Sequence, residues 1–152
     1  MRPDLELLNA SVVGLICSEP VIDRLPVHPW AIDAALAELA TDVEPGSALD
    51  RAIQRWPRNH RAPGLRFLGL QGLLWELAAA GHIRPTGEGS AAHYTLSPEW
   101  RSRHRCLHAA LSRGDRAAVG RAAGHLAYLV AKSTTRSNSR ARSEPLQPSA
   151  SS

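Results

Sequence analysis

The sequence predicts a mainly α-helical fold with one small two-stranded β-hairpin. Three observations support this prediction. Apolar residues recur every three or four positions in most segments, which is typical of helices that bury one face. Apolar and polar residues alternate only in the stretch that follows Gly81, as they do in a half-buried strand. Hydrophobic residues make up 43% of the 152 residues, which is enough for one domain with a core.

The N-terminal region, residues 1–44, predicts two acidic helices joined by a connector. The first helix is DLELLNASVVGLICSE, with Leu8, Val12 and Leu15 on its apolar side. Several prolines between Pro20 and Pro29 make the next ten residues the connector. The second helix is PWAIDAALAELA, whose apolar stripe is Ile32, Leu36 and Leu39.

The middle region, residues 47–98, predicts two helices followed by the hairpin. Ser47 and Asp50 form a capping box for SALDRAIQRW, in which Leu49, Ile53 and Trp56 face inward. A polar loop, PRNHRAPG, leads to a helix over residues 65–80 that Gly81 terminates. The segments HIRP and AAHYTLS form the hairpin around TGEGS, and the residues expected to point into the core are Ile83, Tyr94 and Leu96.

The C-terminal region, residues 98–132, predicts two further helices. Ser97 and Pro98 are typical of a helix start, and Gly114 ends that helix. Asp115 is expected to cap the last helix. Residues 1–132 therefore form a single domain, and residues 133–152, rich in Ser, Arg and Pro, form a disordered tail.

The stretches LLWELAAAGHI and HYTLSP resemble the winged helix-turn-helix regulators, in particular the PadR-like and MarR-like groups, over roughly residues 47–98. The resemblance implies a winged helix with extra N- and C-terminal helices that acts as a transcriptional regulator. It also implies that helix 65–80 enters the major groove of double-stranded DNA and that the hairpin, or wing, touches the backbone. A homodimer would form through the helices at 98–112 and 115–132.

The residues expected to contact DNA lie before, on and after helix 65–80. Gln pairs with adenine in the major groove, and arginine binds phosphate or guanine. The candidates are Arg58, His60 and Arg61 in the loop, Arg66 and Gln71 near the helix start, and Arg84 and His93 on the wing.

The side of this helix opposite its leucines carries Gly72, Trp75, Glu76 and Ala79. Phosphate repels Glu76, and a tryptophan flanked by small residues is a better contact for a protein than for a base. A protein-interaction module without sequence-specific DNA binding is therefore an alternative function, and Trp75 packed beneath the N-terminal helices is a third interpretation. A buried face favours DNA reading through wing and loop, whereas an exposed face favours a protein partner.

The charge is divided unevenly along the chain. Residues 1–50 contain two arginines and nine acids, a net of −7, and residues 51–152 carry a net of +11. A basic body favours an anionic partner such as nucleic acid. Two other readings are a solvated arginine surface and an acidic N-terminal third that docks on the basic remainder. The preference for arginine over lysine and the abundance of alanine are typical of a GC-rich bacterial genome.

His104 and His108 lie four apart on one helix, which is the spacing of two metal ligands. A metal-responsive regulator, similar to the ArsR-like sensors, is therefore a further alternative, although His93 or Cys106 would have to complete the site. No metal or other cofactor is expected. The two cysteines, Cys17 and Cys106, form no disulfide framework and are expected to be buried thiols.

Other classes of protein have little support. Serine, histidine and aspartate occur in no recognisable nucleophile setting, and TGEGS opens no helix that would bind phosphate, so no enzyme is expected. No run of about 18 apolar residues occurs, and Asp4 and Glu6 stand where a signal peptide carries positive charge. We therefore expect a cytoplasmic protein without a membrane segment.

Overall fold

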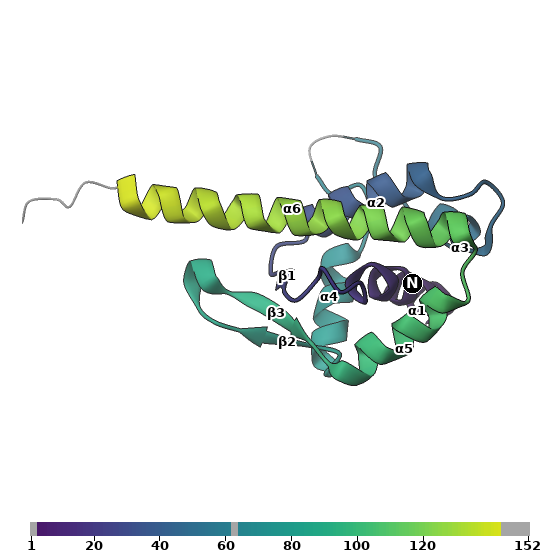
Figure 1. Cartoon of the computed structure of the whole chain (residues 1–152), viewed down its shortest axis with the longest axis horizontal. Helices are drawn as coiled ribbons and strands as arrows, with labels where there is room; N and C mark the ends of the chain where they lie inside the picture. Colours follow the sequence, from purple (N-terminus) through teal and green to yellow (C-terminus); the bar gives the residue numbers. More distant parts are fainter. Residues whose placement is uncertain (1–2, 62–63, 144–152) are drawn as a thin grey trace, which may run out of the picture.

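The structure is a computed structural model that describes residues 3–61 and 64–143. Within this part of the chain, six α-helices surround a small antiparallel sheet (Figure 1). In chain order the elements are α1 Pro3–Cys17, β1 Leu25–Pro26, α2 Trp30–Asp42, α3 Ala48–Arg55, α4 Leu70–Ala79, β2 Ile83–Thr86, a 3₁₀ turn Gly89–Ala91, β3 His93–Leu96, α5 Pro98–Ala109 and α6 Arg113–Ser143. The mainly helical class expected from the sequence is confirmed.

The sheet has three strands rather than the expected two. β1, from the predicted connector, pairs with β3, so that the order is β1–β3–β2 and Leu25 lies opposite Tyr94. The expected hairpin is present, with Ile83 opposite Leu96. Both edge strands contain a proline, Pro26 in β1 and Pro85 in β2, where a missing N–H costs no hydrogen bond in the sheet interior. A two-residue strand has no period of its own, which is why the sequence pattern did not predict β1.

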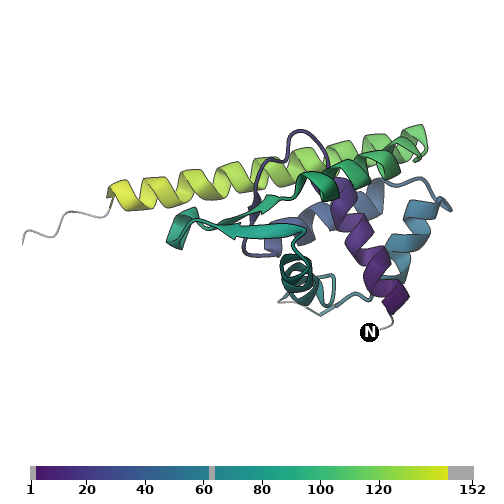
Figure 2. The same ribbon diagram turned by 90° about the horizontal axis from the view of Figure 1, so that it is seen from below.

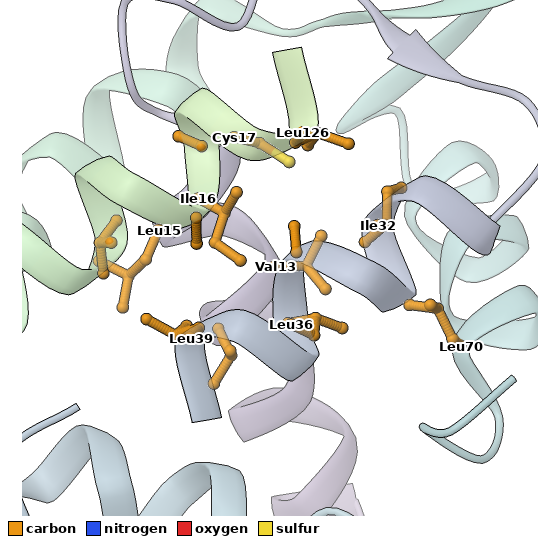
Figure 3. Packing of buried hydrophobic residues seen from close by; sticks show 14 of the residues in the cluster. Val13, Leu15, Ile16, Cys17, Ile32, Leu36, Leu39, Leu70 and Leu126 are labelled. Atoms are coloured by element: carbon orange, nitrogen blue, oxygen red, sulfur yellow. The ribbon is translucent and has the colours of Figure 1, made fainter. Parts of the chain in front are cut away.

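The core lies where α1, α2 and α6 meet (Figure 3). Val13 and Ile16 of α1, Ile32 and Leu36 of α2, and Leu126 of α6 are all buried. α2 packs along α6, and α1 packs against α3, α4, α5 and α6. The N-terminal third is therefore part of the same core as the rest of the chain.

α4 begins five residues later than predicted, at Leu70 rather than residue 65. Phe67 instead forms an antiparallel bridge with Arg58, and its N–H donates to a carboxylate oxygen of Asp33 at 2.9 Å. Gly69 then adopts a left-handed conformation with φ of 76° and precedes the first helical residue. These long-range contacts override the apolar periodicity that extends through residues 65–69.

Helix starts agree with the sequence at two places and differ at a third. The hydroxyls of Ser47 and Ser97 accept hydrogen bonds from the third residue of their helices, as predicted. At α6 the cap is Ser112, whose hydroxyl accepts from the N–H of Asp115 at 3.1 Å. Asp115 itself lies inside the helix and accepts from the N–H of Glu44, so its predicted capping role is wrong.

α6 is longer than the predicted last helix. It continues to Ser143, so residues 133–143 of the expected disordered tail are helical, whereas 144–152 lie outside the described residues. Figure 2 shows α6 along one side of the molecule, with the β2–β3 hairpin projecting beside its outer part. α4, seen nearly end-on, lies on the opposite side (Figure 2). Its outer face is therefore not covered by α6.

Candidate interaction surface

α4 is anchored to the core by the leucines that the sequence placed on one face. Leu70, Leu73, Leu74 and Leu77 are all buried. Gly81, with φ of 82°, ends the helix and turns the chain into β2. The helix is therefore held on its inner side only, and its outer side is available for contacts.

The outer side of α4 is exposed to solvent. Gly72, Trp75, Glu76 and Ala79, which we call the α4 face, are all exposed, and Trp75 is 64% exposed. The interpretation of Trp75 as a core residue is therefore wrong. A side-chain atom added at Gly72 would meet nothing within 4 Å, so the indole stands beside open space.

The α4 face is extended by a residue that the sequence analysis did not select. Leu68, in the turn before α4, is 47% exposed. It precedes Gly72 by four residues and Trp75 by seven, the spacing of side chains on one helix face. Its backbone carbonyl accepts a hydrogen bond from Trp56 Nε1 at 2.8 Å, which holds this turn against α3. That spacing was visible in the sequence, but residues 65–80 read as one buried stripe.

The basic loop between α3 and α4 is an ordered hairpin-like segment. The N–H of Asn59 donates to the carbonyl of Arg66 at 2.7 Å, and the N–H of Leu68 donates to the carbonyl of Pro57 at 3.0 Å. The Arg58 guanidinium lies over the Phe67 ring, 5.1 Å from its centroid. Arg58 is therefore half-buried and engaged within the loop, whereas His60 and Arg61 are exposed.

The remaining DNA candidates are dispersed. Arg66 lies in the loop rather than at the start of the helix, so its predicted position is wrong, and it lines a shallow groove between α2 and α6. Gln71 is half-buried in the first turn of α4. Arg84 is exposed on β2, whereas the half-buried His93 directs Nδ1 to the carbonyl of Ala91 at 2.9 Å. The structure thus brings Arg58 and Arg66 together across the loop, while Arg84 lies beyond the other end of α4.

Ion pairs join the two oppositely charged parts of the chain. Within the described residues there are three: His108–Glu19 at 2.7 Å, Arg121–Asp42 at 3.2 Å and His125–Glu38 at 2.6 Å. Each joins an acid from residues 1–50 to a base from residues 51–152. The acidic N-terminal third therefore does dock on the basic remainder, and part of the net positive charge of that remainder is compensated within the chain.

The two histidines considered as metal ligands are engaged elsewhere. His104 is buried against Gly14 of α1, and its Nδ1 lies 2.8 Å from the carbonyl of Trp100. His108 pairs with Glu19. Among the described residues no three His, Cys, Asp or Glu side chains come together as ligands. Neither His93 nor Cys106 therefore completes a site with these two histidines.

The cysteines differ in environment. Cys17 is buried, and burial raises the pKa of its thiol to about 12, so the reactive thiolate is disfavoured. Cys106 is exposed on α5, which corrects the expectation that both thiols are buried. The α-helical period explains the error, because Cys106 lies away from the buried Trp100 and His104 of the same helix.

Comparisons with known proteins found no match to a protein-family model, to a curated protein or to a solved structure. Within the described part of the chain, no helix combines the length and the apolar character that crossing a bilayer requires.

Proposed function

We propose that this chain is a winged-helix module that binds a protein partner through the α4 face. The observation that carries the proposal is the exposure of Trp75, at 64%, between the small residues Gly72 and Ala79. Tryptophan is the residue type most enriched among those that dominate binding energy at protein interfaces. An indole left in water on a rigid helix is costly to hydrate and becomes favourable once a partner covers it.

The winged-helix part of the proposal rests on the order of the elements. α3, α4, the β2–β3 hairpin and α5 follow one another as the resemblance implies. Ile83 and Tyr94 of the hairpin are buried, so the hairpin is seated on the helical core rather than free in solvent. β1 adds a third strand at the edge of β3.

The chemistry of the α4 face favours a particular kind of protein partner. Glu76 carries the only charge on α4, and it is negative. Leu68 and Trp75 supply the apolar area. The matching surface is therefore an apolar pocket that receives the indole, bordered by an arginine or lysine that pairs with Glu76. A DNA groove offers the opposite, since its phosphates repel Glu76.

DNA binding through phosphate contacts is a second candidate, and one observation favours it. Exposed cationic side chains flank α4 on both sides, with Arg61 and Arg66 before the helix and Arg84 after it. None of these three takes part in the ion pairs found among the described residues. They could bind a duplex backbone while the α4 face stays unused.

The test compares two exposed tryptophans on different surfaces. Full-length wild type, Trp75→Ala, Glu76→Arg and the control Trp30→Ala are immobilised and exposed to lysate of the producing organism. We expect a partner that wild type and Trp30→Ala retain and that Trp75→Ala loses. With the purified partner, Trp75→Ala should weaken binding by about thirtyfold, the equivalent of roughly 2 kcal/mol. Circular dichroism of each variant establishes that the fold is intact.

Several results would contradict the proposal. One is a partner that binds Trp75→Ala as tightly as wild type. A second is a wild-type dimer that Trp75→Ala converts to monomer in sedimentation experiments, because the surface would then serve a second copy of the chain. A third is duplex DNA binding that Arg84→Ala weakens and Trp75→Ala does not, with a salt dependence that falls by about one unit per lost phosphate contact. That result would establish the second candidate.

A further inference from the structure

A cleft of about 500 Å³ lies between three segments that are far apart in sequence. They are residues 24–28 around β1, the outer end of the hairpin at residues 89–93, and Val130 and Ser133 of α6. Figures 1 and 2 both show the outer part of the hairpin beside α6, with the β1 segment next to them. This volume falls in the range of small-molecule sites. It is separate from the α4 face, which lies on the other side of the molecule.

The floor and one edge of the cleft are apolar. Val27, Ala31, Ala92 and Val130 line it, and Trp30 stands at its edge with 46% of its surface exposed. Trp30 is the first residue of α2, so its backbone is held by a helix whose next two residues are completely buried. A rigidly mounted indole beside an apolar floor offers one face to a planar ring.

The polar side chains that line the cleft are cationic or neutral. Arg24 and His28 are exposed, and the half-buried His93 contributes its ring from β3. No aspartate or glutamate is among the lining residues, all of which belong to the described part of the chain. Asp23 and Glu88 are adjacent to the cleft in sequence but do not line it. Arg24 makes no ion pair within the described residues, so its guanidinium is available to a ligand.

We propose that this cleft binds a small organic anion with a planar aromatic body. The ring lies against the Trp30 indole and the apolar floor, and the carboxylate or sulfonate pairs with Arg24. Guanidinium and carboxylate form charge-assisted hydrogen bonds that a neutral ligand cannot make. The site is independent of the proposed protein-binding function, because it shares no residue with the α4 face.

The test uses 1-anilinonaphthalene-8-sulfonate, an aromatic sulfonate, as the probe and the full chain as the protein. Calorimetric titration of wild type should show one site. Arg24→Gln and Trp30→Ala should each weaken binding by about tenfold. The matched controls, Arg113→Gln and Trp75→Ala, change an exposed arginine and an exposed tryptophan elsewhere and should leave the affinity unchanged. The uncharged analogue N-phenyl-1-naphthylamine should bind wild type more weakly and Arg24→Gln about as well as wild type.

A second measurement locates the probe without any substitution. In amide-resolved NMR spectra of wild type, added probe should shift the Gly89, Ala92 and Val130 resonances and leave Gly72 and Ala79 unchanged. Shifts centred on Gly72 and Ala79 would overturn the proposal, as would wild type that binds no probe. Equal affinity of Arg24→Gln and wild type would overturn the role of Arg24 and with it the preference for an anion.

Discussion

His104 occupies the crossing of α5 and α1, and its surroundings disfavour a charged ring. It is 3% exposed, and its ring fills the space left by the missing side chain of Gly14. Trp100 packs edge-on at 4.8 Å between ring centroids, and His82 stacks on the other side of Trp100. Burial lowers the pKa of His104 below the ordinary 6.5, and the nearby charge of Arg103 adds to the effect, while the hydrogen bond to the Trp100 carbonyl opposes it.

This lowered pKa predicts a loss of stability in mild acid. Below about pH 6.5 the unfolded chain takes up a proton that folded His104 resists, so the free energy of unfolding falls as the pH falls toward the folded-state pKa. Above about pH 7 the residue contributes no pH dependence. The slope from this one group is at most about 1.4 kcal/mol per pH unit.

The measurement is urea unfolding between pH 8 and pH 5 for wild type, His104→Gln and the control His60→Gln. His104→Gln should show a shallower loss between pH 6.5 and pH 5 than wild type, and the exposed His60→Gln should follow wild type. Parallel curves for wild type and His104→Gln would contradict the lowered pKa. Other histidines titrate in the same range, which is why the difference between variants is decisive.

At the scale of elements, one buried carboxylate sets where α4 begins. Asp33 of α2 is 6% exposed and accepts the N–H of Phe67 at 2.9 Å. This contact joins α2 to the loop between α3 and α4 and holds Phe67 beside Trp56, at 5.2 Å between ring centroids. The loop in turn positions Leu68 and the first turn of α4, and so the α4 face.

Removal of this acceptor should destabilise the fold and release the loop. Asp33→Ala leaves a buried N–H without a partner, so we expect a loss of about 1–3 kcal/mol in the free energy of unfolding. Asp33→Asn keeps an oxygen acceptor and should lose less. The control Asp42→Ala removes only a partly exposed ion pair and should cost less than about 1 kcal/mol.

Chemical denaturation measures these losses, and hydrogen exchange at the Phe67 amide reports on the loop. Exchange should accelerate in Asp33→Ala more than in Asp33→Asn. If Asp33→Ala and Asp42→Ala had the same stability and the same exchange at Phe67, the loop would not depend on this hydrogen bond.

For the whole molecule, the core extends well beyond the segment that resembles a winged helix. Residues 47–98 bury their leucines, but α1, α2 and α6 supply much of the surface that covers them. The three ion pairs add contacts between the acidic third and the remainder. The unit of folding is therefore the assembly of α1 to α6 and not the central segment alone.

A fragment of residues 47–98 should consequently fail to fold. It would expose Ile53, Leu70 and Leu74, which are all but completely buried in the chain, and a 52-residue segment buries too little surface to compensate for its chain entropy. Circular dichroism and thermal unfolding of the fragment, beside the full chain, provide the test. A cooperative transition in the fragment would contradict this view of the core.

The sequence by itself determined the features that depend on neighbouring residues. These are the helical class, the buried stripes of α2 and α4, the hairpin after Gly81, and the serine caps of α3 and α5, because periodicity, glycine conformation and capping act over one or two turns. The four residues of the α4 face were also selected correctly as a set, from their angle around the helix.

Only the tertiary structure decided whether that face is covered, and it left Trp75 exposed. It also decided the start of α4, through Asp33 and Phe67, 34 positions apart, and the pairing of Leu25 with Tyr94 in the sheet. The cleft beside Trp30 is built from three segments that no local pattern connects. In each case the physical reason is the same, because a contact between residues distant in sequence leaves no period in either segment.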